Sequence, residues 1–424
     1  MRDLGPALIV ASVVLGPGTI LSASRVGAVH GTSALWVPLL AAVVLGGTAA
    51  LAARIGVALA KSPCDELADR LGRPFAALVG ITLFLVVVGF QSSNNFAVVA
   101  ALEPLLLLGG EGALPTWGAA LILLGVNGAV IAAVLGLRGL YAKLEGLMKG
   151  LVAFMAAAFL FNLFAVRPSV RDAVAGLVPQ APDGADGGFL PTRDALGEVV
   201  VPLAALQGLV ATTFSVAGAF YQAYLVKEKG WGPRDGRRAG VEAAVGAGAL
   251  GLMTAMVLLT AAATLHNVEG GGFSTTADLA RQLSPFFGDW AVGIFAAGIL
   301  AGALGSFLGN ALIGGTLLAD GLGKGRSIDS SWVRGLTVAA LLAGAGIAAA
   351  VLAGGAEKVT AIIIAQALTV LGGPLLAGAL LFLGTKVTPR PPIWTFALAG
   401  VGLAIVLALA VRTAWKLGLD LFAG

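Results

Sequence analysis

Apolar runs long enough to cross a membrane recur along the whole 424-residue chain, and they constrain its fold more than any other feature. Each run exceeds 18 residues, about the length at which a helix spans the roughly 30 Å hydrocarbon core of a bilayer. Charged residues make up only 11% of the sequence, whereas soluble domains average roughly 25%. This pattern excludes a soluble enzyme and a disordered chain. A disulfide scaffold is excluded as well, because the single cysteine, Cys64, has no intramolecular partner.

Hydropathy predicts eleven helical spans, because aliphatic runs of roughly 20 residues are too long for the strands of a membrane barrel. The predicted spans are 4–28, 34–59, 76–101, 114–137, 144–166, 199–226, 240–265, 290–319, 332–353, 357–384 and 393–415. The longest gap, 167–198, is rich in Pro, Gly and Asp and is expected to be an external loop. Met1-Arg2-Asp3 is too short for a secretory n-region, so the first run is expected to be a retained span. We therefore expect a single transmembrane domain over 1–424.

The distribution of Lys and Arg favours a cytoplasmic N-terminus. With the N-terminus inside, 18 of the 26 Lys and Arg residues fall on the inner side, including the cluster from Lys227 to Arg238. Positive charge is retained on the cytoplasmic side of membrane proteins. We therefore expect a multi-pass protein of the cell membrane, with its N-terminus in the cytoplasm and its C-terminus outside.

Two of the spans contain residues that favour a break in the helix. Leu15-Gly16-Pro17-Gly18-Thr19 lies in the middle of span one, where Pro removes a backbone donor and Gly permits unwinding. Small and hydroxyl residues occupy 211–219, in the middle of span six. Spans one and six are five spans apart, so the two halves would have opposite orientations. Broken helices at matching places in inverted halves are the sequence sign of a transporter site near the membrane midplane.

At these breaks the sequence resembles the Nramp family of divalent-metal transporters, which share the leucine-transporter (LeuT) fold. Residues 16–19 align without gaps with the family's Asp-Pro-Gly-Asn. Residues 60–68, 137–145 and 366–374 resemble the loop after helix two, the loop before helix five and the helix-ten pattern. The resemblance implies an all-α membrane protein of LeuT type with eleven transmembrane helices. Its two inverted five-helix repeats would cover 1–166 and 199–384, followed by an eleventh helix at 393–415.

The residues that bind the metal in the family are replaced in this chain. The resemblance places the family's metal-binding Asp and Asn of helix one at Gly16 and Thr19, and its helix-six Met at Ser215. The binding carbonyl of helix six falls at Thr212, and the nearby Gln of helix ten falls at Gly372. Transition-metal binding is therefore not carried over to this sequence.

Hydroxyls and amides are the polar groups that such a fold would bring to its centre. They are Thr19 and Ser22 of span one, Gln91, Ser92, Ser93, Asn94 and Asn95 of span three, and Thr212, Thr213 and Ser215 of span six. A dehydrated divalent cation needs counter-charge or several hard oxygen ligands, whereas hydroxyls and helix N-termini can donate hydrogen bonds to an oxyanion. This set favours a small oxyanion such as bicarbonate. A hydrated divalent cation, magnesium or manganese, is the alternative, because hydroxyls also accept and magnesium loses water reluctantly.

Two further residues are candidates for ion handling. Arg25 lies six residues after Thr19, about 9 Å along a helix. It either makes the outer vestibule electropositive, or it reaches the outer interface and pairs with an acid such as Glu103 or Glu198, because charges inside spans are costly. Ser306 in span eight is a possible ligand for sodium as coupling ion, although Ser in a small-residue helix is also typical of helix packing.

We expect a secondary-active transporter of a small inorganic ion that works by alternating access, with no cofactor other than a possible coupling sodium. An intramembrane enzyme is not expected, because H-E-x-x-H, G-x-S-x-G and paired intramembrane acids do not occur. A receptor or scaffold that transports nothing is the third alternative. The expected partners are the lipid bilayer and the transported ion. The net charge of +4 lies in loops and predicts no nucleic-acid surface, and no obligatory protein partner is predicted.

Helix three should supply no proton relay. The resemblance aligns Gln91 and Asn94 with the family's proton-linked Asp and Glu, and neutral amides do not titrate between pH 5 and 8. We expect substrate uptake into proteoliposomes without acidification of the lumen, as measured with an entrapped pH dye. Acidification in step with substrate entry would contradict this and direct attention to another acid, such as Glu242.

Overall fold

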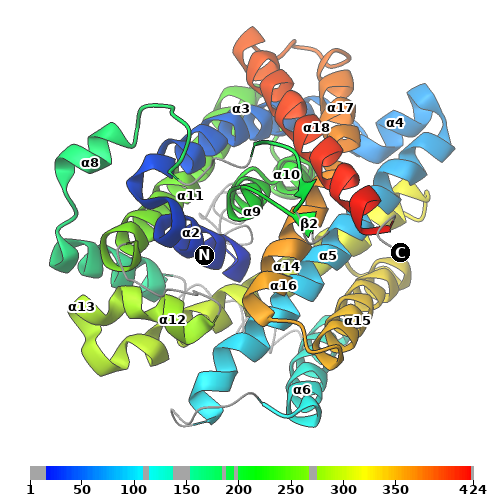
Figure 1. Cartoon of the computed structure of the whole chain (residues 1–424). Helices are drawn as coiled ribbons and strands as arrows, with labels where there is room; N and C mark the ends of the chain where they lie inside the picture. Colours follow the sequence, from blue (N-terminus) through cyan, green and yellow to red (C-terminus); the bar gives the residue numbers. More distant parts are fainter. Residues whose placement is uncertain are drawn as a thin grey trace.

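The computed structural model describes residues 16–107, 114–136, 153–183, 188–194, 199–266 and 275–421, and it is almost entirely helical (Figure 1). Its first half contains α2 (Pro17–His30), η1 (Gly31–Ala34), α3 (Trp36–Ala58), α4 (Pro63–Leu71), α5 (Arg73–Leu106), α6 (Thr116–Leu135), a helix over Ala153–Val166, α8 (Val170–Ala175), β1 (Thr192–Arg193) and β2 (Val199–Val200). The second half contains α9 (Ala204–Thr213), α10 (Val216–Glu228), η2 (Pro233–Asp235), α11 (Gly236–Leu265), α12 (Thr276–Ala280), η3 (Arg281–Leu283), α13 (Ser284–Phe287), η4 (Gly288–Trp290), α14 (Ala291–Gly321), α15 (Ser331–Ala353), α16 (Lys358–Leu368), η5 (Thr369–Gly372), α17 (Gly373–Gly384) and α18 (Ile393–Leu421).

Each of the eleven predicted spans has a helical counterpart in the described ranges. Nine segments are long and apolar enough to cross a membrane. The other two counterparts are shorter: α2 for span one and Ala153–Val166 for span five. The starts of these two spans, 4–15 and 144–152, lie outside the described residues, as does the motif over 137–145.

The predicted start of span six is wrong by five residues. Val199 and Val200 form β2, which pairs antiparallel with β1 in the register Arg193↔Val199 and Thr192↔Val200. The helix α9 begins only at Ala204. Pro202 cannot donate a backbone hydrogen bond, and Leu203 has a left-handed φ of 59°, so the chain turns sharply between strand and helix. The expected external loop 167–198 therefore contains some regular structure, namely α8 and β1.

Helices that occupy the same position in the two five-helix repeats pack against each other. The most extensive contacts join α5 to α14, α3 to α11 and α2 to α11, and α2 also packs against α9. Figure 1 shows α9 and α10 in the middle of the molecule, with α3 and α11 on one side and α5 and α14 on the other. Glycines permit the close approach: a Cβ at Gly27 of α2 would lie 2.9 Å from Ala261 Cβ of α11. Small residues at such contacts are what helix packing in lipid requires.

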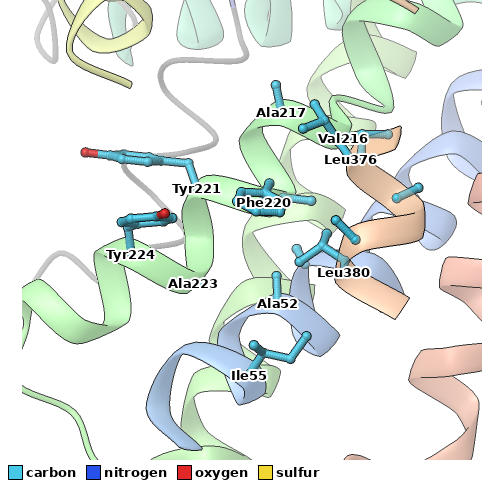
Figure 2. Packing of buried hydrophobic residues seen from close by; sticks show 14 of the residues in the cluster. Ala52, Ile55, Val216, Ala217, Phe220, Tyr221, Ala223, Tyr224, Leu376 and Leu380 are labelled. Atoms are coloured by element: carbon cyan, nitrogen blue, oxygen red, sulfur yellow. The ribbon is translucent and has the colours of Figure 1, made fainter. Parts of the chain in front are cut away.

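Around α10, a buried cluster joins helices from both halves of the chain. Phe220 and its neighbours on α10 pack against Ala52 and Ile55 of α3 and against Leu376 and Leu380 of α17 (Figure 2). The rings of Tyr221 and Tyr224 stack with their centroids 6.1 Å apart, and Figure 2 shows the two rings one above the other beside α10.

The Tyr224 hydroxyl connects α10 to two other elements. It donates to Asp320 Oδ2 of α14 at 2.7 Å and accepts from the Cys64 N–H of α4 at 3.2 Å. Asp320 is only 1% exposed, so its hydrogen bonds are made away from water. Burial raises the pKa of the Cys64 thiol to about 12, so this cysteine stays protonated and unreactive at neutral pH.

Tyr224→Phe should destabilise the protein by about 1–3 kcal/mol, because it leaves a buried carboxylate and a backbone N–H without their shared partner. Thermal unfolding of the detergent-solubilised protein, followed by tryptophan fluorescence, measures the effect. Tyr221→Phe is the matched control, since it removes a neighbouring hydroxyl and leaves the bond from Tyr224 to Asp320 in place. Equal stability of the Tyr224→Phe variant and the wild type would show that this hydroxyl does not hold α10 to α14.

Candidate functional site

Span one is broken at the place that the sequence predicts. The helix α2 begins at Pro17, and Gly16 is its N-cap in an extended conformation (φ −83°, ψ 177°). Pro at the first helical position is favoured, because the N–H that it lacks would have no intrahelical partner. Thr19 N–H donates back to Gly16 C=O at 3.1 Å. The start of α2 therefore brings Gly16, Gly18 and Thr19 to a helix end inside the protein.

Span six is broken at Phe214 and Ser215. The pairing of α9 ends with Phe214 N–H donating to Val210 C=O at 2.8 Å, and that of α10 begins with Ala219 N–H donating to Ser215 C=O at 3.0 Å. Ser215 Oγ caps α10 by accepting from Gly218 N–H at 3.1 Å. The carbonyls of Ala211, Thr212 and Thr213 have no helical partner among the described residues. Backbone acceptors freed in this way are what an ion site in a membrane protein uses.

The two breaks meet at a small pocket. It is lined by Gly16, Gly18, Thr19, Phe90, Asn94, Thr212, Ser215, Ser306, Asn310 and Gln366. Six residues that the sequence singles out are thus brought together: Gly16, Thr19, Asn94, Thr212, Ser215 and Ser306. Their convergence from α2, α5, α9, the break before α10, and α14 gives the candidate site its geometry.

Four candidate site residues, Gln91, Thr213, Gly372 and Arg25, do not line this pocket, and neither do Ser22, Ser92, Ser93 and Asn95 of the predicted polar set. Gln91 donates from Nε2 to Phe307 C=O of α14 at 2.7 Å and stands behind Asn94. Thr213 is fully buried, and its Oγ1 has no hydrogen-bond partner in the described part of the chain. Gly372 packs against Thr82 and Val86 of α5.

Arg25, the fourth, lies beyond the pocket on α2. Its Nη1 donates to Thr360 Oγ1 of α16 at 3.3 Å. Glu103, one of the acids expected to pair with it, is bound instead by Lys358 at 2.9 Å, and Glu198 lies outside the described residues. Whether Arg25 attracts an ion to the outer entrance stays a prediction.

Four pocket residues were not assigned to the site from the sequence: Gly18, Phe90, Asn310 and Gln366. Two of them carry a signal in hindsight, because Phe90 and Asn310 lie four residues from Asn94 and Ser306 and so share their helix faces. Gln366 reaches the pocket because span ten is also interrupted, by the 3-10 turn η5. Gly372-Gly373-Pro374 is the sequence signal for that interruption, and the prediction of one unbroken span over 357–384 missed it.

The hydrogen bonds around the pocket leave several side-chain oxygens available as acceptors. Gln366 donates from Nε2 to Ser93 Oγ at 2.8 Å, and its buried Oε1 has no partner in the described ranges. Asn94 donates from Nδ2 to Gln91 Oε1 at 3.4 Å, and Thr212 Oγ1 donates to Leu209 C=O at 3.0 Å. The oxygens of these three side chains retain lone pairs for a ligand. The wall of the pocket therefore offers neutral oxygen acceptors to a ligand.

No side chain that lines the pocket is ionisable. Within the described ranges, no group of three or more His, Cys, Asp or Glu residues is placed to hold a metal ion. A bound ion would thus be met by neutral oxygens alone. Such oxygens are the ligands preferred by hard cations, and they give no preference for soft metals.

The family model described as "Natural resistance-associated macrophage protein-like" matches residues 7–416. The chain belongs to the Nramp family. The divalent metal cation transporter MntH of Erwinia tasmaniensis is 28% identical over 72% of this chain and 68% of its own length. MntH of Deinococcus radiodurans is 28% identical over 74% of this chain and 68% of its own length. Nramp proteins are multi-pass membrane transporters, which agrees with the expected class.

Solved structures confirm the LeuT-type fold. A mutant of the Eremococcus coleocola manganese transporter superposes with a TM-score of 0.71, at 16% identity, over 96% of this chain and 84% of that one. MHP1, a nucleobase-cation-symport-1 family transporter, superposes with a TM-score of 0.53, at 13% identity, over 99% of this chain and 91% of that one. At these identities the likeness establishes the fold of this Nramp protein and leaves its substrate open.

Gly18→Ala should weaken ligand binding. The new Cβ would lie 2.7 Å from Gln366 Cδ, so the Gln366 side chain and its bond to Ser93 would have to move. Loss of one such hydrogen-bonding partner costs roughly 1–3 kcal/mol, which is about 5- to 150-fold in affinity. Calorimetric titration with manganese, magnesium and bicarbonate measures it. Gly305→Ala, beside Ser306 but with nothing within 4 Å of the new Cβ, should bind normally. Equal affinity of the Gly18→Ala variant would remove Gln366 from the site.

Proposed function

We propose that this Nramp protein transports a hydrated divalent metal cation, magnesium or manganese, by alternating access. The observation that carries the proposal is the direction of the hydrogen bonds at the pocket. Asn94 and Gln366 each donate one amide N–H within the protein, and their oxygens remain available. Acceptors bind the ion itself or the hydrogens of its water shell.

Retention of water on the ion follows from the neutrality of the pocket. Removing the hydration shell of a divalent cation inside a membrane is costly unless counter-charge replaces it, and no carboxylate lines the pocket. A bound ion would therefore keep water around it in place of the missing counter-charge.

The named relatives support a cation over an anion. The curated relatives are called divalent metal cation transporters, and the solved neighbour is a manganese transporter. No comparison supports the bicarbonate preference drawn from the sequence. That preference treated the hydroxyls and amides as donors, whereas Thr212 Oγ1 and the amide of Gln366 donate to the protein itself. The alternative drawn from the sequence, a hydrated divalent cation, is thus the better supported interpretation.

The metal selectivity of this pocket should differ from that of a site with a methionine thioether. Ser215 stands where the family resemblance places a Met, and its hydroxyl is a hard ligand without preference for soft metals. We therefore expect cadmium to bind no better than manganese. Sodium coupling through Ser306 stays a prediction; Ser306 lines the same pocket as Thr19, so a sodium ion there would lie beside the substrate.

The charge sign of the substrate can be tested at Gly16. Gly16→Asp adds a carboxylate to the pocket wall at a backbone conformation that Asp can adopt (φ −83°). For a divalent cation, binding should tighten at least tenfold, because such a charge pair is worth several kcal/mol at an effective dielectric constant of about 20. Calorimetry with magnesium and manganese measures the affinity.

Gly16→Asn is the matched control, since it adds the same volume without the charge. The tightening should appear in the Asp variant and be absent from the Asn variant. Weaker cation binding by Gly16→Asp, with the Asn variant unaffected, would contradict the proposed function.

A further inference from the structure

Three arginines gather at the inner ends of α3 and α11 without an acidic partner among the described residues. They are Arg54 of α3 and Arg237 and Arg238 of the first turn of α11. Arg237 lies close enough to repel the charge of Arg54, and neither makes a salt bridge within the described part of the chain. Like charges held together in this way need an anion to offset their repulsion.

Arg54 can lie against α11 because Gly240 has no side chain. Its guanidinium lies across Gly240, where a Cβ would be 2.7 Å from Nε and 3.3 Å from Cζ and Nη2. Arg54 Nε is buried and has no hydrogen-bond partner in the described ranges. Glu242 is rotated by about 200° from Gly240; it lies four residues after Arg238, on the same helix face, and forms no salt bridge with it in the described part of the chain. Arg237, three positions before Gly240, lies on the same side as Arg54.

The N–H groups at the start of α11 have no side-chain cap. The first turn contains no acidic residue and no side chain caps it, although Asp235 is the N-cap. Asp235 Oδ2 instead accepts from Gly232 N–H at 3.0 Å. Two arginines at the positive end of a 30-residue helix are unfavourable on their own. Helix N-termini with basic residues beside them are typical phosphate sites.

The same face of α11 continues into surface that lipid would cover. Val241 and Val245, one and two turns after Arg237, are 54% and 65% exposed. Trp231, whose ring lies 4.9 Å from the Arg238 guanidinium, has the amphipathic character of residues at the membrane–water interface. A ligand with a phosphate at the arginines and an apolar chain along the valines fits both parts of this surface.

We propose that Arg54, Arg237 and Arg238 bind the phosphate of an anionic phospholipid in the inner leaflet. The acyl chains lie along Val241 and Val245, and the phosphate stands between the start of α11 and Arg54. The proposal is independent of the substrate of the central pocket. Arg54 belongs to α3, which packs against both α10 and α11, so the lipid binds where the helix that follows the span-six break meets its neighbours.

Native mass spectrometry of the full-length protein in detergent tests the site. The wild type should retain one phosphatidylglycerol in preference to phosphatidylcholine. Arg54→Gln and the double change Arg237→Gln, Arg238→Gln should each weaken its binding by about fivefold for every arginine removed. Arg390→Gln is the matched control, because it removes an exposed positive charge between α17 and α18, on the same predicted side of the membrane.

Two outcomes would overturn the proposal. One is phosphatidylglycerol affinity in both arginine variants equal to that of the wild type. The other is displacement of the bound phosphatidylglycerol by millimolar inorganic phosphate, which would identify a site for a water-soluble anion. The double variant changes two exposed side chains, so its folding, verified by gel filtration, should be unaffected even if Arg54→Gln is unstable.

Discussion

Backbone groups inside a membrane must find partners, and the two broken helices of this protein depend on how that requirement is met. At Gly16 and at Phe214–Ser215 the helical pairing stops inside spans that are otherwise buried. Ser215 caps one new helix end, and Gly16 C=O accepts from Thr19 N–H at the other. The carbonyls that remain, together with side chains from α5, α14 and α16, form a wall of neutral acceptors. The close packing of α3 with α11 and of α5 with α14 keeps these pieces in register.

Much of this arrangement is visible in the sequence, because hydropathy and helix-breaking residues are local signals. The runs of apolar residues predict all eleven spans, and Gly16-Pro17-Gly18 predicts the first break. The strand at Val199–Val200 and the turn η5 are less visible, since β pairing with Thr192 and packing of Gly372 on Thr82 depend on residues far away in the chain. Gln366, on the helix before η5, is not among the site residues that the sequence predicts, although it lines the pocket.

The sign of the substrate's charge is the property that the sequence predicts least clearly. Ser, Thr, Asn and Gln each contain donors and acceptors, so composition cannot tell which of them face a ligand. Only the partners decide: once Gln366 donates to Ser93 and Thr212 to Leu209, their oxygens are what the pocket presents. In the proposed function, the replacement of carboxylates by neutral groups changes how a cation is held, with water in place of counter-charge.

The sign of the current carried during transport tests this account most directly. Proteoliposomes on a solid-supported membrane would receive magnesium or manganese, and separately bicarbonate, at equal ionic strength. The account predicts a positive inward current with each divalent cation, saturating with concentration, and none with bicarbonate. An inward negative current with bicarbonate, together with no response to either cation, would contradict it.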